Sequence, residues 1–330
     1  MSATGQASRR SRDVPDLVRR AREGDPRAVA RLVTLVENND PLLPEVARVL
    51  AEYTGQAQIL GLTGSPGVGK STLTNELVRV YRAEGRRVGV LAVDPSSPFT
   101  GGAILGDRVR MQDHATDDGV YIRSMSSRGH LGGLAAATPQ AVRVLEGAGC
   151  HIVIIETVGV GQAEVEVARL ADTTLVLLAP GMGDAIQAVK AGILEVADVF
   201  VVNKADRDGA DATHRDIQGM IALGERQPGQ WRPQVVRSVA ARGEGIDDVV
   251  TAIGKHRAWL SEHGQLQARR EHRATVEVEE IALGTLRARI GTLRHGTALP
   301  GLAAKVAAGQ LDPYTAANDL LTSLDQTDGA

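Results

Sequence analysis

The segment Gly64-Ser65-Pro66-Gly67-Val68-Gly69-Lys70-Ser71 constrains the fold of this chain more than any other part of it. It matches the pattern G-x-x-x-x-G-K-S, in which glycines let backbone N–H groups turn inward and cradle phosphate oxygens. The pattern requires a strand directly before it and a helix directly after it. Apolar periodicity predicts both, a strand over 59–63 and a helix over 72–82. A glycine-rich turn without a ligand is the alternative, and this context disfavours it.

Each part of this phosphate loop has an expected role. Lys70 is expected to reach the β- and γ-phosphates, and the Ser71 hydroxyl to ligate Mg²⁺. The start of the following helix adds the positive end of its dipole. The nucleotide-binding candidates in and around the loop are Gly64, Ser65, Gly67, Val68, Gly69, Lys70, Ser71 and Thr72.

A second segment, Asn203-Lys204-Ala205-Asp206, follows a predicted strand over 199–202. Open α/β sheets bind ligands at this end of their strands. The Asp206 carboxylate is suited to accept hydrogen bonds from N1–H and N2–H₂ of guanine, whereas adenine lacks both donors. The Lys204 stem can lie over the base, and Asn203 can tie this segment to the phosphate loop. The pattern is short, and a solvated polar loop is its alternative.

The next strand, predicted over 233–236, leads into Ser238-Val239-Ala240. A backbone N–H of this segment is placed to touch the guanine O6. The motif is weak, and an ordinary turn is an equally good interpretation of this segment.

Three carboxylates are candidates for holding Mg²⁺, directly or through water. Asp94 ends the predicted strand 88–93, where it could instead cap the following turn. Asp107 is either a metal-linked switch residue or an N-terminal helix residue. Glu156 opens Glu156-Thr157-Val158-Gly159, which resembles the D-x-x-G segment of GTPases with glutamate replacing aspartate.

The Gly159 N–H is expected to contact the γ-phosphate, so that nucleotide state moves the segment 156–164. In Ras-like GTPases a glutamine that orients water follows this glycine. Here that position is Val160, and Gln162 is out of register. We therefore expect slow intrinsic hydrolysis that a partner accelerates.

Short apolar runs alternate with helical stretches between residues 57 and 260. These runs do not alternate with polar residues, as is typical of strands buried on both faces of a parallel sheet. We predict an α/β P-loop NTPase domain over 57–260, with a mostly parallel central sheet flanked by helices. The predicted strands cover 59–63, 88–93, 120–123, 151–155, 174–178, 199–202 and 233–236.

The sequence patterns at the two ends of the chain differ from the α/β pattern of residues 57–260. Residues 1–13 are polar and predicted to be disordered. Residues 14–56 carry helical periodicity, with Asp25-Pro26 as a predicted cap, and form a helical N-terminal extension. Residues 261–330 are predicted to be helical, with a last helix beginning at Asp312-Pro313. They could pack on a second copy of the chain or on themselves.

Composition excludes several classes of protein. The chain has 330 residues and a net charge of −3, so it has no basic excess for nucleic acid or an anionic membrane. It has no apolar stretch near the length of a membrane span and no signal-peptide pattern. A single cysteine, Cys150, rules out an internal disulfide and is predicted to be a core thiol. The expectation is a soluble, cytoplasmic protein.

Several motifs together resemble the MeaB/ArgK family, whose human member is the MMAA protein. The resemblance covers about residues 15–325. The motifs that carry it are Thr63–Leu73, Asp94-Pro95-Ser96-Ser97, Gly106–Met111, Arg128–Gly133, Glu156–Gln162 and Pro180–Asp184.

The resemblance implies a homodimeric P-loop GTPase with a C-terminal dimerisation arm. It implies a chaperone that gates adenosylcobalamin loading of methylmalonyl-CoA mutase and protects that enzyme from inactivation, with cobalamin adenosyltransferase as a further partner. It maps metal residues onto Ser71, Asp94, Asp107 and Glu156. It also maps a mobile coupling segment onto about 177–192, with Asp184 and Lys190. The expected catalytic set is Lys70, Asp94, Asp107, Glu156 and Lys190.

Two other functions stay open. One is an ATPase or kinase associated with arginine/ornithine transport, which conflicts with a guanine-reading Asp206. The other is a metal-insertion GTPase, a class that usually carries His-rich or Cys-rich segments, and this sequence has neither.

Overall fold

A computed structural model describes residues 13–94, 114, 116–126, 137–157, 163–181, 194–224, 229–294 and 298–327. The chain forms two compact units, Met1–Arg270 and Glu271–Ala330. Nearly all of the predicted disordered tail lies outside the described residues, and the predicted domain boundaries stay predictions.

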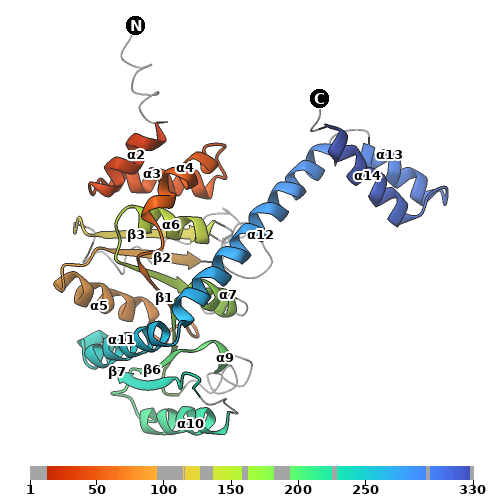
Figure 1. Ribbon diagram of the computed structural model, residues 1–330. Coiled ribbons are helices and arrows are strands. Elements are labelled where there is room, and N and C mark those ends of the chain that lie inside the picture. The colour runs from red at the N-terminus through yellow and green to blue at the C-terminus, as the bar shows by residue number, and fades with distance from the viewer. Residues whose placement is uncertain are drawn as a thin grey trace. The chain divides into compact units, whose positions relative to one another are not determined.

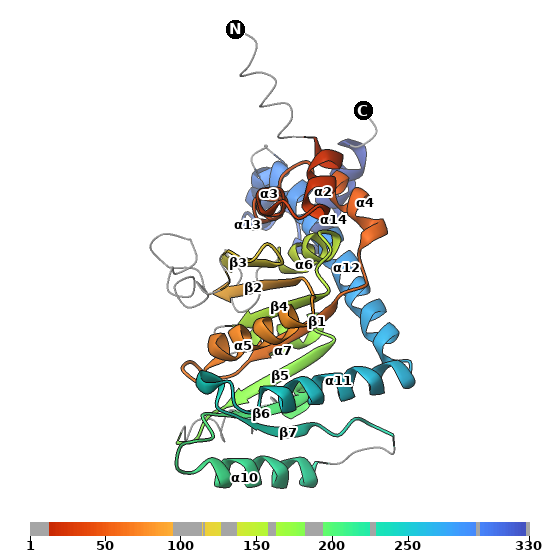
Figure 2. The ribbon, with the colours of Figure 1, turned by 90° about the vertical axis from the view of Figure 1, so that its left-hand side faces the viewer.

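The first unit is built on a seven-stranded sheet with the order β3-β2-β4-β1-β5-β6-β7. Every recorded pair of neighbouring strands is parallel, so their carboxyl ends meet at one edge (Figure 2). This confirms the predicted α/β fold, and each predicted strand overlaps an observed one. The strands are β1 Gln58–Thr63, β2 Val88–Asp94, β3 Val120–Ser126, β4 Ile152–Thr157, β5 Thr173–Leu178, β6 Val199–Asn203 and β7 Gln234–Ser238.

Helices cover both faces of the sheet, which explains the uninterrupted apolar runs. Leu60 and Leu62 of β1 pack on the face covered by α5 (Lys70–Ala83) and α11 (Ile246–Glu262) (Figure 1). Ile59 packs on the other face, with α6 (Thr138–Gly147) and α7 (Ala163–Leu170). On β5 and β6 this second face is covered by α10 (Ala210–Leu223). Short helices occur at α9 Leu194–Val196 and η4 Ala240–Arg242.

The N-terminal helices extend the second face of the sheet. They are α2 Val14–Arg22, α3 Pro26–Glu37 and α4 Leu43–Leu50, followed by η1 Ala51–Tyr53. Their apolar sides share one hydrophobic cluster with α6 and with β1 to β4. The extension is therefore packed into the core of the first unit.

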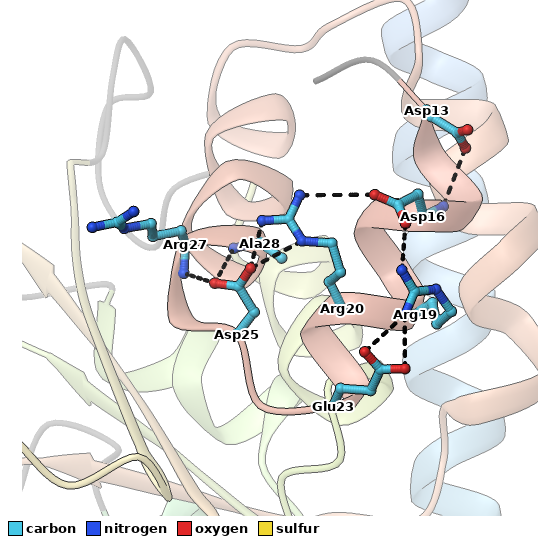
Figure 3. Close-up of polar contacts among 8 residues, drawn as sticks. All are labelled: Asp13, Asp16, Arg19, Arg20, Glu23, Asp25, Arg27 and Ala28. Carbon is cyan, nitrogen blue, oxygen red and sulfur yellow. Dashed lines mark hydrogen bonds and ion pairs between the residues drawn. The ribbon is translucent and has the colours of Figure 1, made fainter. Parts of the chain in front are cut away.

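Asp25 forms the predicted helix cap between α2 and α3 (Figure 3). Its carboxylate accepts from the backbone N–H of Arg27 at 2.9 Å and of Ala28 at 3.4 Å, which satisfies donors at the start of α3. Arg20 Nε donates to the same carboxylate at 3.0 Å and is the main cause that lowers the Asp25 pKa. This confirms the cap predicted from Asp25-Pro26.

The second unit is helical. It contains most of α12 (Gln265–Arg294), with α13 (Ala298–Ala307) and α14 (Pro313–Thr327). The Asp312 carboxylate accepts from the N–H of Tyr314 and of Thr315, each at 3.0 Å, so α14 begins where the sequence predicted. No strand occurs among the described residues after Ser238.

Two composition-based expectations can be compared with the structure. None of the described helices combines the length and the apolar character needed to cross a membrane. Cys150 is buried, and this burial raises the pKa of its thiol to about 12. That environment confirms the predicted core thiol, because a protonated buried thiol behaves as a small apolar side chain.

Buried aspartates hold the amino ends of β5 and β6. Asp172 precedes β5 and accepts from Ile59 N at 3.0 Å. Asp198 precedes β6 and accepts from Thr174 N at 2.8 Å and from both terminal nitrogens of Arg269 at 3.0 and 2.9 Å. The first turns of α12 are thereby tied to the sheet edge opposite the phosphate loop.

His256 of α11 completes this buried cluster. Its Nδ1 lies 2.9 Å from Thr173 Oγ1 and its Nε2 lies 3.2 Å from Asp198 Oδ1. Burial alone would raise the Asp198 pKa, but His256 and Arg269 outweigh it and hold that pKa below its ordinary value. The stability that Asp198 contributes is therefore present above about pH 4 and is lost as pH falls through the lower folded pKa.

Asp198→Ala should lower the free energy of unfolding by about 1–3 kcal/mol, because it leaves the buried Thr174 N–H and the partly exposed Arg269 without their acceptor. Chemical denaturation at pH 7 measures this, and the difference from the wild type should shrink in acid. The matched control is Asp211→Ala, whose exposed ion pair with Arg237 should contribute about 0–1 kcal/mol. Equal stability of the two variants would contradict the assignment.

Candidate functional site

The phosphate loop connects β1 to α5, in the context that the sequence predicted. Three of its glycines have positive φ, +137° at Gly64, +80° at Gly67 and +98° at Gly69. A Cβ at Gly64 would lie 2.3 Å from the Leu177 carbonyl oxygen, and one at Gly69 would lie 2.3 Å from Asn203 Nδ2. Backbone conformation and close neighbours therefore both require glycine here.

Lys70 lies within the loop that precedes it. Its Nζ donates to the carbonyl oxygens of Gly64 at 2.7 Å and of Ser65 at 3.0 Å, and its side chain is buried. The ammonium thus holds the loop closed around the position where phosphate is expected. Val68 is buried beneath the loop, whereas Thr72 is exposed on the first turn of α5.

Ser71 and Glu156 meet directly, although 85 positions separate them in the sequence. The Ser71 hydroxyl donates to Glu156 Oε1 at 2.6 Å, and the Thr74 hydroxyl donates to Oε2 at 2.9 Å. Glu156 comes from β4, the neighbour of β1, and is 5% exposed. A hydroxyl and a carboxylate in contact form the hard-oxygen donor set that Mg²⁺ prefers, so these two predicted residues fit the ion.

The other predicted metal and switch residues are described only in part. The backbone of Asp94 ends β2 at the same sheet edge, since Ala92 is opposite Glu156. The Asp94 side chain, Asp107, Gly159, Asp184 and Lys190 lie outside the described residues, as do Val160 and Gln162. Within the described part of the chain, no group of three or more His, Cys, Asp or Glu residues could hold a metal ion.

Asn203 joins three loops at this edge of the sheet. Its Nδ2 donates to the Val68 carbonyl at 2.8 Å, which is the link to the phosphate loop expected from the sequence. Its Oδ1 accepts from the Ser238 hydroxyl at 3.1 Å and from the Ala240 N–H at 3.0 Å. The side chain is buried, so these bonds are shielded from water.

Lys204 and Asp206 continue from Asn203 into the base-reading segment. Lys204 has a φ of +56°, and its Nζ donates to the Gly67 carbonyl at 2.6 Å, so its stem crosses toward the phosphate loop. The Asp206 side chain is 33% exposed, and its Oδ2 lies 3.2 Å from Arg242 Nη2. The carboxylate is accessible to a ligand and already faces one cation.

The loop after β7 uses two of its backbone N–H groups for hydrogen bonds within the protein. The Val239 N–H donates to the Glu244 carbonyl at 3.0 Å, and the Ala240 N–H donates to Asn203 Oδ1. Both N–H groups are therefore engaged within the protein in this structure. A contact from the segment Ser238-Val239-Ala240 to the guanine O6 stays a prediction.

Sequence reasoning missed Thr74 and Arg242. Thr74 lies three positions after Ser71 and shares its face of α5, but its contact with Glu156 also depends on the strand order that places β4 beside β1. Arg242 carries no signal of that kind, since its meeting with Asp206 depends on how the 238–245 loop folds.

Comparisons with known proteins agree with this geometry. A sequence model of the family described as methylmalonyl Co-A mutase-associated GTPase MeaB matches residues 29–293. The GTPase ArgK of Escherichia coli is 40% identical over 78% of this chain and 80% of its own. A mouse protein named methylmalonic aciduria type A homolog, mitochondrial, is 35% identical over 91% of this chain and 76% of its own.

A solved structure is similar across almost the whole chain. The crystal structure of a protein named LAO/AO transport system kinase has a TM-score of 0.70 and 28% identity, and the match covers 94% of this chain and 97% of that one. The similarity therefore includes the sheet and the loops that carry the site. The strand–loop–helix geometry at Gly64–Ser71 agrees with the matches to the family model and to the named relatives. This chain therefore belongs to the MeaB family of P-loop GTPases, enzymes that hydrolyse GTP.

Proposed function

We propose that this GTPase gates adenosylcobalamin loading of methylmalonyl-CoA mutase and protects the mutase from inactivation. The observation that carries the proposal is the match over residues 29–293 to a family described as mutase-associated. The name of the mouse relative, which refers to methylmalonic aciduria, supports the same link. Cobalamin adenosyltransferase is a further proposed partner.

The nucleotide site supports a switch that depends on GTP. Backbone N–H groups of Gly64–Ser71 bind the phosphates, and Lys70 neutralises and orients them. Ser71 and Glu156 would hold Mg²⁺ together with Asp94 and Asp107. The ion, when bound, supplies positive charge to the phosphate oxygens. Gly159 and Lys190 remain proposed for sensing the γ-phosphate and for the coupling segment, and Val160 supports slow intrinsic hydrolysis.

Base selection is assigned to Asn203, Lys204 and Asp206, with the 238–240 segment beside them. Asn203 is fixed by its hydrogen bonds, so Asp206 is presented at a constant position relative to the phosphate loop. Lys204 extends across the loop, where its stem can cover a base. This arrangement favours guanine over adenine. The exposed acceptor is the Asp206 carboxylate, and guanine offers it the N1–H and N2–H₂ donors that adenine lacks.

Asp206→Asn should weaken GTP binding by about 10–100-fold, because it loses a charged acceptor for two guanine donors. The same variant should gain affinity for xanthosine triphosphate, whose 2-oxo group matches the new amide N–H. Titration with fluorescent nucleotides measures both. Asp211→Asn, an exposed acid on α10, is the control and should leave affinity unchanged. Unchanged GTP affinity in Asp206→Asn would reject the base-reading role.

The mutase proposal is tested by turnover of GTP and of ATP with and without adenosylcobalamin-dependent methylmalonyl-CoA mutase. We expect GTP to be hydrolysed slowly alone and faster with the mutase, and the mutase to lose activity more slowly when this GTPase is present. No response to the mutase would count against the proposal.

One observation favours a second candidate, a kinase or ATPase associated with transport of basic amino acids. The similar solved structure is that of a protein named LAO/AO transport system kinase. A kinase function requires transfer of the γ-phosphoryl group to an acceptor. Preference for ATP in the turnover experiment, with labelled phosphate appearing on a metabolite or protein, would support it over the mutase proposal.

The second unit is proposed to form a homodimer interface. Several apolar side chains on it are exposed, with Val278 at 67%, Ile281 at 49% and Leu286 at 46% on α12 and Tyr314 at 85% on α14. Val278, Ile281 and Leu286 recur at helical spacing, so they form a stripe that a second copy could cover.

Ile281→Glu should convert the dimer to a monomer, because it places a charge in the covered stripe. Light scattering of the eluted protein should change from about twice the chain mass of 34.8 kDa to that mass. Leu223→Glu on α10, where Leu223 is 86% exposed, is the control and should remain dimeric. A dimer that persists in Ile281→Glu would contradict this interface.

A further inference from the structure

Glu156 is a buried carboxylate whose two oxygens are held by two different hydroxyls of α5. Ser71 donates to Oε1 at 2.6 Å and Thr74 donates to Oε2 at 2.9 Å. Thr74 is fully buried, and Ser71 and Glu156 are 9% and 5% exposed. A buried carboxylate is costly unless its oxygens are hydrogen-bonded, so both hydroxyls matter to where this group can lie.

The Thr74 hydroxyl had a local alternative. A threonine inside a helix commonly donates to the carbonyl four residues earlier, as Thr34, Thr213 and Thr275 do in this chain. Thr74 donates instead to Glu156 of the neighbouring strand β4, 82 positions away in the sequence. The buried Thr74 hydroxyl could therefore be hydrogen-bonded without Glu156.

The spacing of the two hydroxyls fits a glutamate. Residues three apart on a helix lie on one face and are separated by about 4.5 Å along its axis. Glu156 spans them by giving one oxygen to each. An aspartate at this strand position has one methylene less, so its carboxylate would lie closer to β4 and could not reach the same two points. The glutamate and Thr74 thus form a matched pair.

We propose that Thr74 is a positioning residue for the magnesium site: it fixes Oε2 of Glu156, and Oε1 is thereby kept against Ser71. The inference rests on the proposed role of Ser71 and Glu156 in holding Mg²⁺. Removing the Thr74 hydroxyl takes away one of the two hydroxyl hydrogen bonds that hold the carboxylate and lets the carboxylate turn away from Ser71. Outer residues that orient metal ligands typically change metal affinity about 10–100-fold.

The experiment follows release of fluorescent GDP from the full chain as a function of Mg²⁺ concentration. Thr74→Val removes the hydroxyl at nearly constant volume, and Thr74→Ser keeps it. Thr173→Val is the matched control, because Thr173 is also a fully buried threonine but bonds His256 at the opposite edge of the sheet. Glu156→Asp tests the pair from the carboxylate side.

The Mg²⁺ concentration that half-maximally slows GDP release should rise about 10–100-fold in Thr74→Val and in Glu156→Asp. It should stay near the wild-type value in Thr74→Ser and Thr173→Val. Adding Thr74→Val to Glu156→Asp should cause little further change, because the two residues act through one contact.

Equal Mg²⁺ dependence of Thr74→Val and Thr173→Val would overturn the inference. If Thr74→Val does not fold, Glu156→Asp decides, and a wild-type Mg²⁺ dependence in that variant would overturn it too. A wild-type protein whose GDP release ignores Mg²⁺ would instead refute the magnesium site itself, so the two failures are distinguishable.

Discussion

The side-chain amide of Asn203 is the interaction on which assembly of this nucleotide site depends. It donates to the phosphate loop at Val68 and accepts from Ser238 and Ala240, so one planar group connects the loops that follow β1, β6 and β7. Gly69 belongs to the same constraint, because a Cβ there would lie 2.3 Å from Asn203 Nδ2. The glycine pattern of the phosphate loop and the asparagine of the base-reading segment are therefore two sides of one contact.

Buried carboxylates accept hydrogen bonds from different kinds of donor at the two ends of the strands. At the amino ends, Asp172 and Asp198 are bonded by strand N–H groups and by the guanidinium groups of Arg270 and Arg269, which bring positive charge with them. At the carboxyl end, Ser71 and Thr74 satisfy the oxygens of Glu156 with neutral hydroxyls. Hydroxyl donors orient a carboxylate without contributing positive charge.

Much of this could be predicted from the sequence, because the signals are local. Strands buried on both faces read as apolar runs, and the phosphate loop requires its own strand and helix. The tie from Asn203 to the phosphate loop could also be predicted, since both segments follow strands of one parallel sheet. Thr74 needed one further fact, that β4 is inserted beside β1 and brings Glu156 over α5. The engaged N–H groups of Val239 and Ala240, and the position of Arg242, depend on a turn whose hydrogen bonds the sequence does not encode as a pattern.

The end of the first compact unit is likewise set by contacts that no local sequence pattern shows. Composition changes near residue 260, where apolar strands give way to charged helix, yet the unit extends to Arg270. Arg269 donates to Asp198 and to the Asp172 carbonyl, and Arg270 donates to the Ala57 carbonyl at 3.0 Å, directly before β1. These bonds satisfy largely buried acceptors at the starts of three strands. The first turns of α12 are consequently part of what folds the sheet, even though nothing in their charged sequence distinguishes them from a solvated helix.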